Sequence, residues 1–153
     1  MKKNIQKGMI DVGEKSASRR TAKAEATVLL SAEAFQELKA GGCPKGNVLE
    51  TARIAGIMAV KRTPEVIPFC HPLEISKANV VCQLDAKNHT VHIVSEVAYT
   101  GKTGVEMEAL TAVSAAALTV YDMMKYADKG IVLKEIRLLQ KTGGKSGDFK
   151  RTP

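Results

Sequence analysis

Two side chains that could take part in a reaction, Cys70 and His71, are adjacent in a proline-rich segment. A histidine held between prolines can act as a general acid, an anion ligand or a metal ligand, and the ordinary alternative is a histidine with a satisfied hydrogen bond. A zinc site that adds Cys82 lacks the spacing of known zinc motifs, so we predict no metal site. The pair therefore remains a candidate for binding or catalysis.

Carboxylates lie at both ends of the longest helical pattern. Glu106 and Glu108 are about 200° apart on a helix, so we expect one of them to precede the helix, although acidic residues also simply favour a first turn. Asp122 and Lys125 are three residues apart and therefore neighbours, either as an exposed ion pair or as a tuned acid and base. Glu108 and Asp122 lie within about 40° of one face and about 21 Å apart along the axis.

A stretch rich in glycine and lysine lies near the C-terminus, from Lys141 to Ser146. This stretch and Thr100 to Thr103 both contain Gly-Lys-Ser/Thr, but neither has the earlier glycine of a phosphate-binding P-loop. Glycines still let backbone N–H groups approach phosphate oxygens, and Lys141 and Lys145 supply positive charge. The ordinary alternative is a frayed terminus.

Charge is concentrated at the two ends of the 153-residue chain, whose net charge is +7. Residues 1–30 carry seven Lys and Arg against three Asp and Glu, residues 141–153 carry four against one, and the remainder is neutral. Either the ends are solvated tails or one of them closes over a polyanion.

The length favours one domain, and no apolar run is long enough to span a bilayer. Without a secretory signal or a disulfide pattern, we expect a cytoplasmic location.

Periodicity predicts the elements that must position these residues. The order of expected elements is β, two helices, β, β, α, β, which is the βαββαβ order of a ferredoxin-like α+β fold with helices on one face of an antiparallel sheet. The expected strands are 21–30, 77–84, 90–99 and 131–140, and the expected helices are 32–39, 48–61 and 105–127. Three prolines predict an irregular loop over 63–73. We expect a mobile segment over 1–18, a single domain over 19–141 and a flexible tail over 142–153.

Several blocks together resemble the MoaC family, the cyclic pyranopterin monophosphate synthases of molybdenum cofactor biosynthesis. They are Lys-Gly-Asn-Val-Leu-Glu-Thr-Ala-Arg-Ile-Ala-Gly-Ile at 45–57, Pro-Phe-Cys-His-Pro-Leu at 68–73, Thr-Gly-Lys-Thr-Gly-Val-Glu-Met-Glu-Ala-Leu-Thr-Ala at 100–112, Tyr-Asp-Met at 121–123 and Lys-Thr-Gly-Gly-Lys-Ser-Gly-Asp at 141–148. The resemblance runs from about Asp11 to Lys150. One departure is Asn47, where the family pattern has Asp. Both residues cap a helix well, so we expect no change in activity.

The resemblance implies a lyase that converts 3′,8-cyclo-7,8-dihydroguanosine 5′-triphosphate into cyclic pyranopterin monophosphate with loss of pyrophosphate. It implies a ferredoxin-like subunit in a homohexamer, a trimer of dimers. It assigns catalytic roles to Lys45, Asp122 and Lys125. It assigns substrate binding to Phe69, Cys70, His71, Glu106, Met107, Glu108, Lys141 and Lys145. The step is non-redox and requires no cofactor, and the sequence neither requires nor excludes Mg²⁺ on the triphosphate.

Helix geometry and the resemblance together predict a shared active site. Because Glu108 and Asp122 of one chain are too far apart for one nucleotide, we expect two subunits to pack this helix antiparallel across a two-fold axis. One subunit would supply His71 and the Glu106–Glu108 segment, and the other Asp122 and Lys125. Small side chains at Ala112, Ala115 and Ala116 would permit the approach.

Two other classes of protein share some of these features. RNA-binding modules have the same βαββαβ order, but they need aromatic residues on their central strands, and the expected strands offer only Tyr99. A non-catalytic assembly protein is the second alternative. We therefore expect neither nucleic acid nor a membrane as a partner.

Overall fold

The computed structural model describes residues 7–153. The prediction of a mobile segment over 1–18 falls partly on residues 1–6, which lie outside the described residues. Residues 7–17 contain turns but no helix or strand, and the first strand begins at Ser18 rather than at Thr21.

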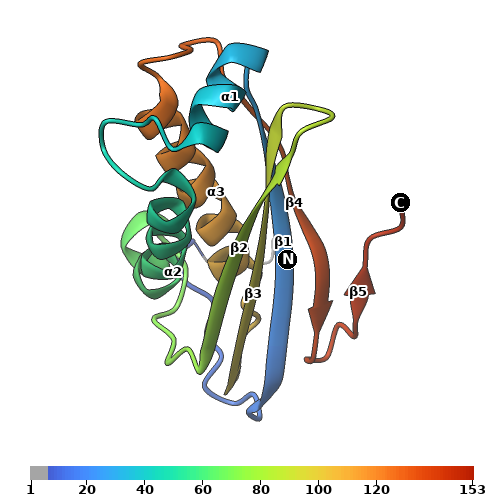
Figure 1. Cartoon of the computed structure of the whole chain (residues 1–153). Coiled ribbons are helices and arrows are strands. Elements are labelled where there is room, and N and C mark those ends of the chain that lie inside the picture. Colours follow the sequence, from blue (N-terminus) through green and yellow to red (C-terminus); the bar gives the residue numbers. More distant parts are fainter. Residues whose placement is uncertain (1–6) are drawn as a thin grey trace.

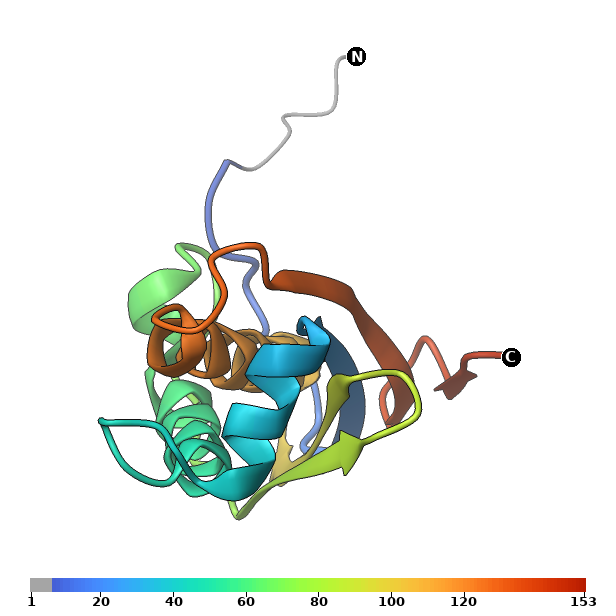
Figure 2. The same cartoon turned by 45° about the horizontal axis from the view of Figure 1, so that its top comes forward.

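Antiparallel strands form one open sheet in the order β2-β3-β1-β4-β5, and the helices cover one of its faces (Figures 1 and 2). The predicted ferredoxin-like α+β fold is confirmed. The elements are β1 (Ser18–Leu29), α1 (Ala32–Ala40), α2 (Val48–Val66), β2 (Lys77–Asp85), β3 (Thr90–Gly101), α3 (Glu106–Met124), β4 (Val132–Thr142) and β5 (Phe149–Lys150).

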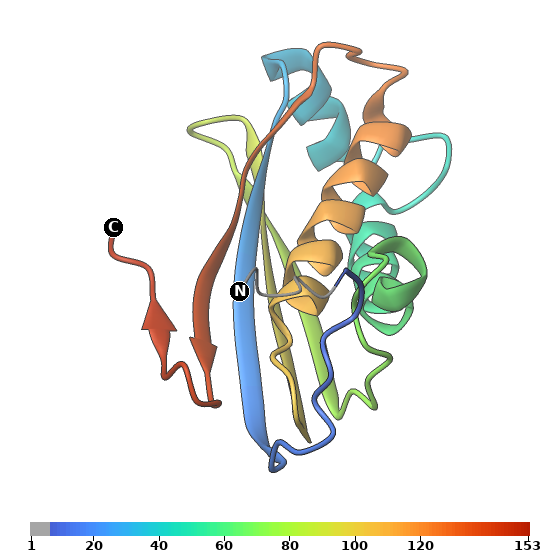
Figure 3. The same cartoon turned by 180° about the vertical axis from the view of Figure 1, so that it is seen from behind.

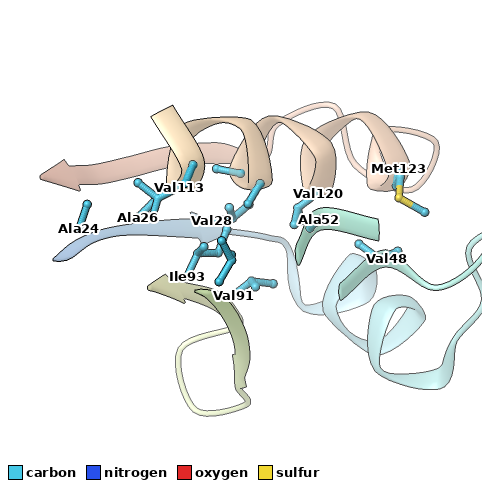
Figure 4. Close-up of a cluster of buried hydrophobic side chains, with 14 of the residues drawn as sticks. Ala24, Ala26, Val28, Val48, Ala52, Val91, Ile93, Val113, Val120 and Met123 are labelled. Carbon is cyan, nitrogen blue, oxygen red and sulfur yellow. The ribbon is translucent and has the colours of Figure 1, made fainter. Parts of the chain in front are cut away.

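The core lies between the sheet and α3. Alternate residues of β1, among them Ala24, Ala26 and Val28, are fully buried and face the helices. Figure 4 shows these side chains packed with Ile93 of β3 and Val113 of α3. Alanines at the centre of β1 let the helix lie close to the sheet, so α3 is held rigidly along it.

Helix α2 is longer than predicted, because it continues through Pro64 to Val66. A proline lacks the N–H that would bond to the carbonyl of residue i−4, here Val60. The hydroxyl of Thr63 takes this place, donating to the Val60 and Ala59 oxygens at 3.2 and 3.0 Å. The prediction that no regular element survives from residue 63 is therefore wrong for its first residues.

Helix α3 begins at Glu106, so both Glu106 and Glu108 lie in its first turn. The expectation that one of them precedes the helix is wrong, but they do face different surroundings. Glu108 is only 3% exposed, whereas Glu106 faces a cavity. The helix ends at Met124, three residues earlier than predicted.

The C-terminal tail contains a short strand. β5 lies beside β4 at the edge of the sheet farthest from β2, with Lys141 opposite Phe149 (Figures 1 and 3). Strand β4 itself extends to Thr142, two residues past the predicted end. The tail is therefore not irregular throughout, and its mobility stays a prediction.

Candidate active site

A cationic cavity of about 520 Å³ lies where β1 begins and β3 and β4 end. The sheet register brings these ends together, because Ser18 is opposite Gly101 and Thr21 is opposite Thr142. Five basic side chains line the cavity, and Glu106 is the one carboxylate among them. The basic residues are Lys15, Arg20, Lys102, Lys141 and Lys145. Such a cavity suits a multiply charged anion.

Backbone atoms of neighbouring segments hold the Arg20 guanidinium at this cavity. Its Nε donates to the Gly101 oxygen at 3.3 Å. A Cβ at Gly144 would collide with Arg20 Nη1, and both Gly143 and Gly144 have φ of +88°. These two glycines therefore allow the tail to turn directly against Arg20.

Ser18 adds an unused polar atom to the cavity wall. Across residues 7–153, its Oγ is the one buried side-chain nitrogen or oxygen without a hydrogen-bond partner. A buried hydroxyl without a partner costs free energy, which a ligand oxygen in the cavity would offset.

A second group of charges lies at the other end of α3. The Lys45 Nζ donates to Asp122 Oδ2 at 2.7 Å, and Lys125 Nζ pairs with Asp122 Oδ1 at 2.9 Å. These hydrogen bonds hold the pKa of the Asp122 carboxyl below its usual value, and the one from Lys45 has the largest effect. All three side chains are about half exposed and therefore accessible to a ligand.

A third group contains Glu108 and Cys70. Burial raises the pKa of Glu108 to about 7, with a smaller contribution from the charge of Glu106 and against the lowering effect of a backbone hydrogen bond. Burial, together with the nearby Glu108 charge, also raises the pKa of the Cys70 thiol. His71 is partly exposed, and the Phe69 ring is 66% exposed.

The structure thus divides the predicted site residues between the two ends of one helix. Glu106, Lys141 and Lys145 meet at the cationic cavity, and Lys45, Asp122 and Lys125 meet at the far end. The fourteen residues from Glu108 to Asp122 correspond to about 21 Å of helix. A single chain does not bring all the predicted residues together.

The predicted contact face of α3 needs a correction. Ala112 and Ala116 are fully buried inside the chain, so they cannot meet a second copy, whereas Ala115 is partly exposed. The side of α3 that faces solvent also carries Met107, which is 38% exposed, and Leu118, which is 60% exposed.

Sequence reasoning did not find Arg20, Lys102, Lys15 or Ser18. The signal for Lys15 and Arg20 was the excess of basic residues at the ends of the chain, whereas Lys102 lies in its neutral middle, in the Gly-Lys-Thr stretch. That excess could not be assigned to a site, because only the pairing of β1 with β3 and β4 brings the two ends together.

The described residues also bear on the alternatives. Tyr99 is 3% exposed and belongs to the buried core, so it cannot stack on an RNA base. Among residues 7–153, no group of three or more His, Cys, Asp or Glu side chains is placed to hold a metal ion. No helix in the same range is both long and apolar enough to cross a bilayer.

The fold and the cavity together define the class: a ferredoxin-like α+β protein with a site suited to a phosphorylated ligand. Residues 9–144 match the model of the MoaC family. The chain is 52% identical over 145 residues to the cyclic pyranopterin monophosphate synthase of Methylobacterium sp. (strain 4-46), covering 95% of this chain and 91% of that protein. It is 55% identical over 141 residues to the synthase of Roseiflexus sp. (strain RS-1), covering 92% and 89%. The chain belongs to the MoaC family.

Proposed function

We propose that this chain converts 3′,8-cyclo-7,8-dihydroguanosine 5′-triphosphate into cyclic pyranopterin monophosphate and pyrophosphate, a step of molybdenum cofactor biosynthesis. Its relatives are named as synthases of that product. The observation that carries the proposal is the cationic cavity, whose five basic side chains complement a triphosphate.

The cavity would hold the triphosphate and stabilise the departing pyrophosphate. Attack of a ribose hydroxyl on the α-phosphate develops charge on the leaving group, and fixed cations lower the free energy of that transition state. Lys141 lies on β4 and Lys145 follows the end of that strand, while Arg20 lies on the neighbouring strand β1. The Ser18 hydroxyl would donate to a phosphate oxygen.

Ring rearrangement also needs groups that donate and accept protons. Glu108 has a pKa of about 7, close to neutral pH, so it can serve as either acid or base. Asp122 stays ionised between Lys45 and Lys125 and would act as a base whose proton affinity its neighbours tune. We assign Phe69, Cys70, His71 and Met107 to substrate binding.

The complete site would be shared by two subunits. Glu108 and Asp122 stand about 21 Å apart along α3 of one chain, and antiparallel packing of α3 against its copy would bring Asp122 of one chain beside the Glu106–Glu108 segment of the other. The exposed side chains of Met107 and Leu118 support this packing, because they are apolar side chains on the solvent-facing side of α3. Assembly of three such dimers into a hexamer, and a cytoplasmic location, complete the proposal.

Incubation of the purified protein with the cyclised dihydro-GTP tests the activity. We expect stoichiometric pyrophosphate and cyclic pyranopterin monophosphate, identified by mass, and parallel reactions with and without Mg²⁺ decide whether a cation on the triphosphate is needed. Calorimetric binding of the precursor without conversion would indicate an assembly protein. Neither binding nor conversion would overturn the proposal.

A further inference from the structure

Lys45 reaches Asp122 from a short loop between α1 and α2. The loop contains a tight turn over residues 43–46, closed by a hydrogen bond from the Gly46 N–H to the Cys43 oxygen at 3.1 Å. Pro44 at the second position and Gly46 at the fourth favour a type I turn. Lys45 lies at its third position, and its side chain is 53% exposed. Core packing therefore does not hold this side chain, and its position depends on how the turn is anchored.

Cys43 anchors the first residue of the turn. The residue is 7% exposed, and its Sγ donates to the Met123 oxygen at 3.1 Å. That carbonyl lies in the last turn of α3, where helix oxygens lack intrahelical donors. The Ala127 N–H, which would continue the helical pattern, bonds to Met124 instead, at 2.9 Å. The thiol thus binds a carbonyl one residue from Asp122.

Tyr126 provides a second connection to the same loop. Its hydroxyl donates to Glu37 Oε2 at 3.2 Å, and the Glu37 backbone oxygen accepts from the Gly42 N–H at 3.0 Å. Tyr126 therefore ties the end of α3 to the point where the loop leaves α1. Its ring also lines the cavity that contains Lys45 and Asp122.

We propose that Cys43 and Tyr126 are positioning residues, which hold the 43–46 turn on the end of α3 and so keep the Lys45 amine on Asp122. The expected change in turnover rests on the proposed function, whereas the role of the two residues in holding Lys45 on Asp122 does not. If the anchors are lost, the lysine leaves and Asp122 keeps only Lys125 as a direct partner, with Lys129 as the remaining cation lining the cavity.

The titration of the Asp122 carboxyl, followed by ¹³C NMR on the full chain, reports whether Lys45 is in place. We expect Cys43→Ala to move the Asp122 midpoint upward, toward that of Lys45→Ala, and to lower kcat about three- to tenfold with a smaller change in KM. Cys43→Ser keeps a donor and should restore both values. Tyr126→Phe should shift both in the same direction by less. Cys82→Ala, which removes a partly buried thiol from β2, should change neither.

The results separate this proposal from the proposed function. A native Asp122 midpoint in both Cys43→Ala and Tyr126→Phe overturns the positioning role, whatever the activity. A shift in only one variant removes the other residue from that role. A shifted midpoint in a protein whose native form releases no pyrophosphate refutes the function but supports the anchors. If Cys43→Ala unfolds, Tyr126→Phe decides, since that side chain is about half exposed.

Discussion

Burial sets the acidity of Glu108. The side chain lies almost entirely out of water, where the charged form is penalised, and its pKa is raised to about 7 from an ordinary 4.5. Because the folded protein holds this proton more tightly than the unfolded chain, the free energy of unfolding falls as pH rises from about 4.5 to about 7.

Replacing this carboxyl should remove that pH dependence. As the pH rises from about 4.5 to about 7, loss of the Glu108 proton should lower the free energy of unfolding of the native protein by about 3 kcal/mol. The Glu108→Gln variant should not show this loss. Urea unfolding of both proteins at pH 5 and pH 8 measures it. Parallel losses of stability in the two proteins would show that Glu108 titrates normally.

Lys45 and His71 should be needed for turnover but not for folding. Each is at least partly exposed, in an irregular stretch of chain, so Lys45→Ala and His71→Ala should lower the rate of pyrophosphate release at least about tenfold and leave the melting temperature nearly unchanged. Lys87→Ala, at the exposed turn between β2 and β3, is the matched control. Near-normal release in either variant would remove that residue from the site.

At the scale of elements, the alternation of apolar residues and the capping residues predict most of the fold. The errors lie in where helices end, and side-chain hydrogen bonds at those ends explain them. The period-two strand that became β1 buries its alternate residues as expected, and Asn47 caps α2. The prolines predict a break at Pro64, because a sequence pattern does not show that the Thr63 hydroxyl replaces the missing donor.

The Asn47 cap gives a stability prediction for α2. Its side-chain oxygen accepts from the Glu50 N–H at 3.0 Å. Asn47→Ala should therefore cost about 1 kcal/mol of stability, whereas Asn47→Asp should leave both stability and turnover unchanged. Denaturant unfolding with a turnover assay checks both. Loss of activity in Asn47→Asp would mean that the amide contacts substrate.

At the scale of the whole molecule, the two basic ends of the chain meet at one cavity. The Lys45, Asp122 and Lys125 group could be predicted from local spacing and from family resemblance. Arg20 and Lys102 could not, because they contribute to the cavity only through the register of three strands.

Removing the tail should weaken substrate binding without unfolding the protein. Because β4 continues to Thr142, a chain that ends there keeps the strand and Lys141 but loses Lys145. We expect KM to rise at least about tenfold, through the loss of a cation from the cavity, and the melting temperature to change little. Unchanged kinetics would show that the tail plays no part in binding.

Complementation tests the shared site most directly. Asp122→Ala and His71→Ala proteins, each inactive alone, are mixed in equal amounts, and subunit exchange is verified by mass spectrometry. Random pairing makes half of the dimers mixed, and one of the two sites in each mixed dimer is intact. We predict that pyrophosphate release recovers to about a quarter of the native rate. No recovery at any mixing ratio, with exchange verified, would contradict a site built from two subunits.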